Sequence, residues 1–144
     1  MGAGTGLGGI AACMLGADMT FTDLEAGLDI CASNVGLNLN SSTHSYHVKS
    51  LDWCHDLSGE WSGEKFDFII GADLIYIEDV FHDLVNTIAF FMEQNRDAVM
   101  YLTGKIRYEE RYAKFRKILD KRFGVEKVDF TVADGIYVLK IIPL

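Results

Sequence analysis

A glycine-rich turn at the beginning of the sequence restricts the possible folds more than any other feature. The stretch Gly2-Ala3-Gly4-Thr5-Gly6 precedes an apolar segment, residues 7–15, that is predicted to be helical. Glycine lets the backbone approach a ligand where a Cβ would collide, and the helix N-terminus beyond it offers free amides and positive potential. Gly4, Gly6 and Gly9 also match G-x-G-x-x-G, so a dinucleotide site is equally open. Tight packing of helix on sheet is the structural alternative.

Strand and helix patterns alternate along the rest of the chain. Residues 66–72 are almost continuously apolar, which predicts a strand buried on both faces, and Gly16 predicts the end of the first helix. We expect helices at residues 7–15, 24–39, 80–92 and 109–122, with strands at 19–22, 46–48, 66–72, 98–102, 125–130 and 136–142. In the helices we expect apolar side chains at helical spacing, namely Leu24, Leu28, Ile30, Cys31 and Val35 in one and Phe115, Ile118 and Leu119 in another. The order predicts an α/β sandwich, mostly parallel, that closes on an antiparallel strand pair around a turn at Asp134-Gly135.

Composition places the chain among cytoplasmic globular proteins. Its 144 residues predict a single domain spanning 1–144, and its net charge of −8 argues against a nucleic-acid partner. No apolar run is long enough to span a bilayer, and the first residues lack the pattern of a secretory signal. The three cysteines form no CxxC, and the four histidines lack metal-ligand spacing, so we expect reduced thiols and no metal site.

Asp23 follows the predicted strand at residues 19–22, at about the distance that a ribose-binding acid keeps from such a turn. Its carboxylate is placed to accept hydrogen bonds from ribose hydroxyls, although an acid here could instead cap the helix that follows. NAD and S-adenosylmethionine both contain a ribose, so this residue does not choose between them.

Two later stretches carry further candidate side chains. Trp53 follows the predicted strand at residues 46–48, in Leu51-Asp52-Trp53, and could line an adenine pocket, although a lone tryptophan is more often part of a core. Asp73 and Tyr76 follow the predicted strand at residues 66–72, in Gly71-Ala72-Asp73-Leu74-Ile75-Tyr76. Open α/β sheets bind ligands at the carboxyl ends of their strands, so both side chains are predicted at the mouth of a cleft. A helix cap is the alternative for Asp73.

Together these stretches resemble the seven-strand, Rossmann-like protein-lysine methyltransferases of the methyltransferase-like group (family 16). The resemblance lies in Gly-Ala-Gly-Thr-Gly, the strand-end Asp, Leu-Asp-Trp and the D-x-x-Y motif Asp-Leu-Ile-Tyr. Lys105-Ile106-Arg107-Tyr108-Glu109 is most similar to the branch that acts on heat-shock chaperones. The resemblance implies S-adenosylmethionine as cofactor and, as partner, a protein that presents a lysine, with a chaperone as the expected substrate.

The same resemblance implies a role for each matching residue. The cofactor would be held by Gly2, Ala3, Gly4, Asp23, Trp53 and Ala72. Asp73 and Tyr76 would meet the target amine, by alignment, hydrogen bonding and cation–π contact more than by general-base catalysis. A rim for the protein substrate could come from Lys105, Arg107, Tyr108, Arg111 and Tyr112, or these could form an ordinary solvated helix face.

The family pattern begins with an N-terminal segment and a central first strand, and we expect this chain to lack most of both. The neighbouring strands would then lose a ladder of hydrogen bonds, so we expect poor folding and weak or no activity. A non-catalytic fragment or pseudoenzyme that binds proteins is therefore one alternative. An NAD-dependent oxidoreductase is a weaker one, because it leaves Trp53, Asp73 and Tyr76 without a use.

Overall fold

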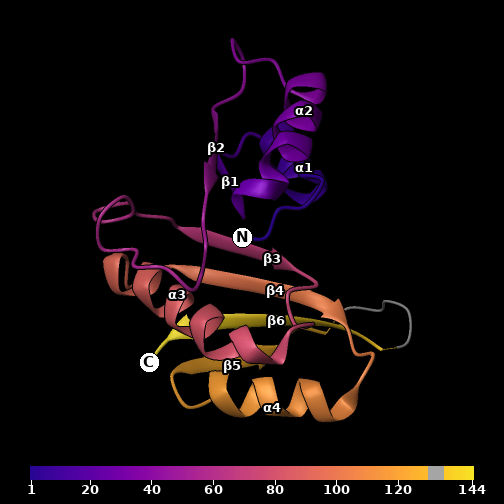
Figure 1. Cartoon of the computed structure of the whole chain (residues 1–144), viewed down its shortest axis with the longest axis vertical. Coiled ribbons are helices and arrows are strands. Elements are labelled where there is room, and N and C mark those ends of the chain that lie inside the picture. The colour runs from indigo at the N-terminus through magenta and orange to yellow at the C-terminus, as the bar shows by residue number, and fades with distance from the viewer. Residues whose placement is uncertain (130–134) are drawn as a thin grey trace. The chain divides into compact units, whose positions relative to one another are not determined.

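The computed structural model describes residues 1–129 and 135–144 of the chain and divides into two compact units (Figure 1). Unit 1 comprises Met1–Asp52 and unit 2 comprises Trp53–Leu144. The expectation of a single domain stays a prediction.

Unit 1 is a parallel strand pair with two helices. Its elements are α1 (Leu7–Met14), β1 (Met19–Asp23), the short 3-10 helix η1 (Glu25–Gly27), α2 (Leu28–Asn38) and β2 (Tyr46–Ser50). β1 and β2 run parallel, with Met19 opposite Tyr46 and Asp23 opposite Ser50. The predicted helix at 24–39 is thus a 3-10 turn followed by a shorter α-helix.

One apolar cluster holds the helices and strands of unit 1 together. Phe21 of β1 is 2% exposed and packs with buried side chains of both helices, which places α1 and α2 on the same face of the strand pair. The buried members are Ile10, Cys13, Phe21, Cys31, Val35 and Leu39. Of the apolar residues noted at helical spacing in this segment, Leu24 and Ile30 are 54% and 61% exposed. Leu24 precedes the helical turns altogether, and within α2 the buried residues Cys31 and Val35 repeat at i, i+4, a row from which Ile30 is rotated away.

Unit 2 contains a four-stranded sheet in the order β3-β4-β6-β5. β3 and β4 are parallel, whereas β6 lies antiparallel between β4 and β5, so the predicted antiparallel end is confirmed. The elements are β3 (Phe68–Ala72), η2 (Glu78–Val80), α3 (Phe81–Gln94), β4 (Val99–Lys105), α4 (Glu109–Leu119), β5 (Phe123–Lys127) and β6 (Ile136–Pro143).

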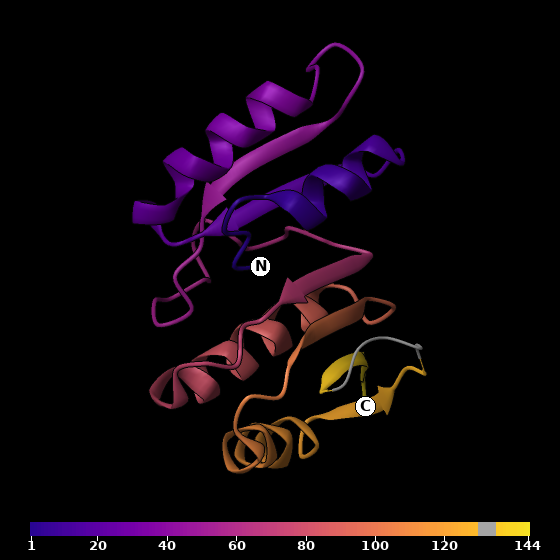
Figure 2. The ribbon, with the colours of Figure 1, turned by 90° about the vertical axis from the view of Figure 1, so that its right-hand side faces the viewer.

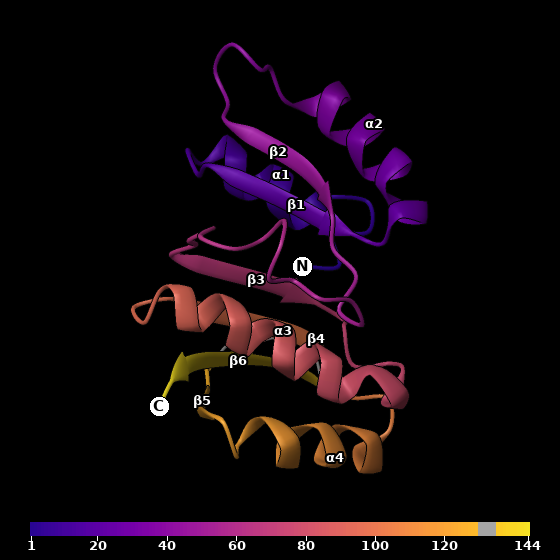
Figure 3. The same cartoon turned by 60° about the vertical axis from the view of Figure 1, so that its left-hand side comes forward.

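Helices α3 and α4 cover the same face of this sheet (Figures 2 and 3). The rings of Phe81 and Phe115 meet edge to face at 5.2 Å between the two helices. β3 is not buried on both faces as predicted: Phe68 and Ile70 are 65% and 38% exposed, while Ile69 is buried. The sheet carries α3 and α4 on one face, so only alternate residues of β3 are covered by them.

The alternation of strands and helices confirms the predicted α/β class. β1 and β3 each stand at the end of their sheet among the described strands. Phe130, the predicted end of a strand, and Asp134 of the predicted turn lie outside the described residues.

The described part of the chain has neither a membrane-spanning helix nor a metal-binding cluster of side chains. No helix there is long and apolar enough to cross a membrane. No three His, Cys, Asp or Glu side chains there gather in a way that could hold a metal ion. Cys13 and Cys31 are buried free thiols, and Cys54 is an exposed one.

Candidate functional site

The glycine turn of unit 1 has the backbone conformation that glycine alone adopts easily. Gly2, Gly4 and Gly6 have φ angles of 56°, 54° and 83°, in the left-handed region that costs other residues free energy. The amide of Ala3 donates to the Thr22 carbonyl at 2.8 Å, which fastens the turn to the end of β1. A Cβ added at Gly4 would meet no heavy atom within 4 Å. The space beside this part of the turn is therefore open.

Asp23, at the end of β1, holds this turn in place with its carboxylate. One carboxylate oxygen accepts the Gly4 amide at 2.7 Å, and the other accepts the Leu24 amide at 2.8 Å. The second bond joins neighbouring residues and is not the helix cap of the alternative interpretation, because neither η1 nor α2 has a side-chain cap. A carboxylate offers about four acceptor positions, so the two that remain can receive hydroxyl groups.

Gly9 explains how α1 comes close to β1. A Cβ at this position would lie 2.4 Å from a ring carbon of Phe21, far inside van der Waals contact. The third glycine of G-x-G-x-x-G thus serves helix–strand packing, whereas Gly2 and Gly4 shape the turn.

The remaining predicted cofactor residues lie in unit 2. Trp53 is partly exposed in a turn and is not a core residue. The core tryptophan is Trp61, which is 3% exposed and meets Phe91 edge to face at 5.5 Å. Ala72 ends β3 and is exposed.

Asp73 follows β3 in an unusual backbone conformation. Its φ of 58° places a non-glycine residue in the left-handed region, which aspartate and asparagine tolerate better than most residues. Its amide donates to the Thr103 carbonyl at 2.8 Å, so the neighbouring strand β4 fixes the turn. The helix cap considered for Asp73 is absent: η2 begins later, after Ile77, with no side-chain cap.

The Asp73 carboxylate is held by a bidentate ion pair with Arg107. The two guanidinium nitrogens Nη1 and Nη2 donate to Oδ1 and Oδ2 at 2.6 and 2.8 Å. Hydrogen bonding to Arg107 lowers the pKa of Asp73 below its ordinary value, and the Lys105 amide contributes in the same direction. Both side chains stay about half exposed, so solvent and a ligand can reach the pair.

Tyrosines and basic residues surround this ion pair. A small cavity is lined by Ile75, Tyr76, Lys105, Ile106, Arg107, Tyr108, Arg111, Tyr112 and Tyr137. Tyr76 is 58% exposed, whereas Tyr137 is buried and touches the Tyr112 ring at 4.9 Å between centroids. Burial raises the pKa of Tyr137, so its hydroxyl stays protonated. The structure therefore brings Asp73 and Tyr76 together with most of the predicted rim.

The sequence did not reveal Arg107 as the partner of Asp73, nor Tyr137 and Gly104 as parts of this region. A Cβ at Gly104 would lie 2.5 Å from the Tyr137 hydroxyl, so the glycine makes room for it. The available signal was strand order: side chains that follow two parallel neighbouring strands emerge at the same sheet edge.

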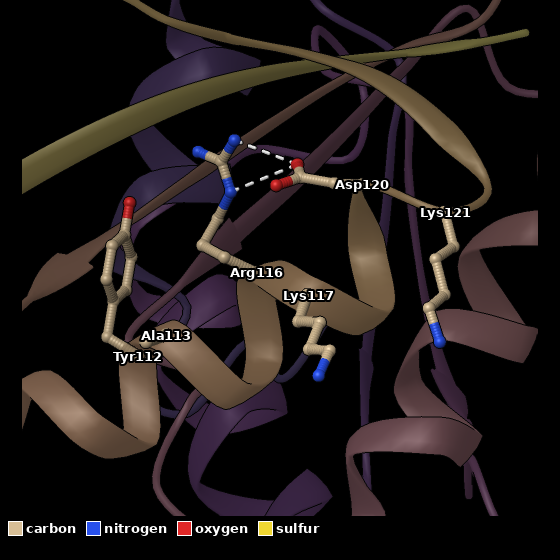
Figure 4. A pocket seen from close by; sticks show the side chains of 6 residues that line it. All are labelled: Tyr112, Ala113, Arg116, Lys117, Asp120 and Lys121. Carbon is tan, nitrogen blue, oxygen red and sulfur yellow. Dashed lines mark hydrogen bonds and ion pairs between the residues drawn. The ribbon is translucent and has the colours of Figure 1, made fainter.

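A second, shallow depression lies on α4 and lacks comparable chemistry (Figure 4). Its carboxylate, Asp120, accepts two hydrogen bonds from Arg116, at 3.2 and 2.8 Å. The Lys117 and Lys121 side chains point away from this pair. We therefore take the Asp73 region as the candidate site of unit 2.

Comparison with known proteins adds three findings. A family described as lysine methyltransferase matches residues 1–122. The protein N-lysine methyltransferase METTL21A of Mus musculus is 40% identical over 141 residues, which are 97% of this chain and 63% of that protein. The EEF1A lysine methyltransferase 3 of Xenopus tropicalis is 32% identical over 142 residues, covering 98% and 61%. The chain thus spans about three fifths of the length of these relatives.

Solved structures agree on the fold. The magnesium protoporphyrin IX methyltransferase of Synechocystis PCC 6803, determined with bound SAH, has a TM-score of 0.69 at 16% identity. The likeness covers 99% of this chain and 72% of that one. At this identity it supports the Rossmann-like α/β fold alone.

Proposed function

Because the chain belongs to the lysine methyltransferase family, we propose that it transfers a methyl group from S-adenosylmethionine to a lysine side chain of a protein. The observation that carries the proposal is the family match over residues 1–122, which include both the glycine turn and the D-x-x-Y motif. Family membership also favours methyl transfer over hydride transfer with NAD.

The residues of unit 1 fit the nucleoside part of such a cofactor. The open space beside Gly4 would admit it, and the free acceptor positions of Asp23 would receive ribose hydroxyls. We assign cofactor contacts to Gly2, Ala3, Gly4 and Asp23. Trp53 and Ala72 are assigned to the same cofactor from the resemblance. When bound, S-adenosylmethionine supplies an electrophilic methyl group on a sulfonium.

Asp73 and Tyr76 are assigned to the lysine amine. A carboxylate attracts an ammonium, and an exposed tyrosine ring can hold the same cation over its face. The lysine must lose a proton before its nitrogen can attack. The lowered pKa of Asp73 makes it a weak proton acceptor, so Asp73 acts by holding and orienting the amine, and the proton leaves to solvent.

The substrate is a protein, and we propose a heat-shock chaperone first. The support is the stretch Lys105-Ile106-Arg107-Tyr108-Glu109, similar to the chaperone-modifying branch. The name of the frog relative states that it acts on EEF1A, so an elongation factor is the second substrate to test. Incubation of each with labelled cofactor, followed by peptide mass spectrometry, distinguishes them.

Calorimetric titration tests the cofactor assignment. We expect S-adenosylhomocysteine to bind and NAD not to bind. Asp23→Asn should weaken S-adenosylhomocysteine about 10- to 100-fold, because hydrogen bonds to a charged group contribute roughly 1.5–3 kcal/mol. Asp29→Asn, on the exposed first turn of α2, is the matched control and should bind as the unchanged chain does. Equal affinity in both variants would contradict the role of Asp23.

A further inference from the structure

Arg107 already binds the carboxylate of Asp73, and the proposed function assigns the substrate amine to that same carboxylate. Arg107 takes one position on each carboxylate oxygen. A lysine ammonium is a donor of the same charge that seeks the same oxygens. The inference below rests on the proposed function, because it concerns how that amine gains access to Asp73.

The geometry of the ion pair allows another cation to replace Arg107 as the partner of Asp73. Arg107 and Asp73 are 53% and 52% exposed, and solvent-exposed ion pairs contribute little net stability. The carboxylate itself stays in place when the partner changes, because the Thr103 carbonyl holds the Asp73 amide. An incoming ammonium therefore meets a fixed, ionised acceptor with a replaceable partner.

The charges around Arg107 determine which kind of group would bind its guanidinium after it leaves Asp73. Residues 105–122 contain eight Lys or Arg and three Asp or Glu, although the whole chain has 13 basic and 21 acidic residues. Lys105 and Arg111 line the same small cavity as Arg107. A guanidinium released from Asp73 would thus remain among positive charges, where an external carboxylate would compensate it.

Two nearby acids are already engaged in ion pairs of their own. Glu78 already accepts from Lys114 at 3.1 Å and from Arg111 at 3.5 Å. Glu110 is paired with Lys114 at 3.5 Å. Glu109 is exposed on the first turn of α4, and a carboxylate of the substrate would compete with it for the released guanidinium.

We propose that Arg107 is a positioning residue that yields Asp73 to the substrate lysine and then binds an acidic residue next to that lysine. The exchange replaces one ion pair by two: the guanidinium–carboxylate pair gives way to an ammonium–carboxylate pair and a new guanidinium–carboxylate pair. It makes an acidic neighbour a determinant of substrate choice.

Two peptides and two matched variants test this proposal in the full chain. The probes are pentapeptides with a central lysine flanked by either two aspartates or two asparagines, and binding is measured by calorimetry without cofactor. We expect the aspartate peptide to bind about tenfold more tightly. Arg107→Gln should remove the preference, Arg107→Lys should retain part of it without the bidentate geometry, and Arg96→Gln, at another exposed arginine of unit 2, should keep it in full.

An independent readout follows the exchange itself. Addition of n-butylammonium chloride should shift the guanidinium nitrogen signals of Arg107 in ¹⁵N NMR spectra toward those of a free arginine, and Asp73→Asn should abolish that response. In a methylation assay with the aspartate peptide, Arg107→Gln should raise KM with little change in kcat.

The outcomes separate this inference from the proposed function. Exchange and peptide preference without methylation would overturn the function but keep the role of Arg107. Methylation with the same peptide preference in Arg107→Gln, or Arg107 signals unaffected by n-butylammonium, would overturn the inference and leave the function standing.

Discussion

The two units carry different parts of the proposed chemistry, and they differ in the size of the sheet and core that support it. Unit 1 places the glycine turn and Asp23 on a two-stranded sheet with a core cluster of six buried side chains. Unit 2 places Asp73, Tyr76 and Arg107 on a four-stranded sheet covered by two helices. Two-stranded sheets and domains of this size are marginally stable by themselves. The nucleotide half of the function therefore rests on the weaker core, and a ligand bound there would stabilise it by mass action.

The largest expected effect comes from one phenylalanine in each core. Phe21 is 2% exposed in unit 1 and Phe115 is fully buried in unit 2. Replacing either with alanine should cost about 3–5 kcal/mol. Because unit 1 has less stability to lose, Phe21→Ala should remove protection from β1 and β2 amides in hydrogen exchange.

Phe115→Ala is the matched change for that measurement. It should lower the protection of α3 and β4 amides by a similar free energy but leave them measurably protected. Equal residual protection of the two units would show that the smaller core is not the weaker one.

An intermediate effect is expected within α1. Gly9→Ala would place a Cβ 2.4 Å from the Phe21 ring, whereas a Cβ at Gly8 would meet no heavy atom within 4 Å. We expect Gly9→Ala to destabilise unit 1 by about 1–3 kcal/mol through overpacking. Gly8→Ala should stabilise it by about 0.4–1 kcal/mol, because alanine favours the helix. Urea unfolding followed by Tyr46 NMR signals distinguishes them, and equal midpoints would contradict the packing role of Gly9.

The smallest expected effect is a loss of unit 2 stability at low pH. Arg107 lowers the pKa of Asp73 below 3.8, and Lys114 lowers that of Glu78 below 4.5. A carboxyl group whose pKa is depressed by folding stabilises the folded state above its unfolded pKa, and this contribution is lost as the pH falls through its folded pKa. Tm should therefore fall slightly below about pH 4, and less so in Asp73→Asn.

Asp79→Asn, at an exposed acid beside Glu78, is the matched change in net charge. It should leave the slope of Tm against pH closer to that of the unchanged chain. The same slope in Asp73→Asn as in the unchanged chain would show that the ion pair does not persist in solution.

Periodicity and turn chemistry were enough to predict the element order. The glycine turn, the strand ending at Asp23 and the strand before Asp73 all lie where their patterns predicted. Local patterns failed where burial depends on neighbours, as at Phe68 and Ile70 on β3, or where helical phase matters, as at Ile30. Apolar composition indicates which residues can be buried, and only the packing partners decide which of them are.

The candidate site was predictable residue by residue but not pair by pair. The D-x-x-Y motif predicted Asp73 and Tyr76 as site residues, and Arg107 pairs with Asp73 and lines the same cavity as Tyr76. Their roles in the reaction stay predictions. The partnership of Asp73 and Arg107 spans 34 positions in the sequence, so no local spacing could reveal it. Trp61, and not Trp53, is the core tryptophan. Its burial depends on a partner that is distant in the sequence, Phe91, so local patterns did not predict it.

The left-handed backbone at Asp73 has a consequence for how this family could diversify. Asparagine and glycine are the replacements that keep such a turn at little conformational cost. Asparagine differs from aspartate by one nucleotide in the genetic code and has nearly the same shape. Under the proposed function, a single inherited change would thus leave a folded chain without the carboxylate that holds the lysine amine, and sequencing of position 73 across populations and duplicated genes would reveal such descendants.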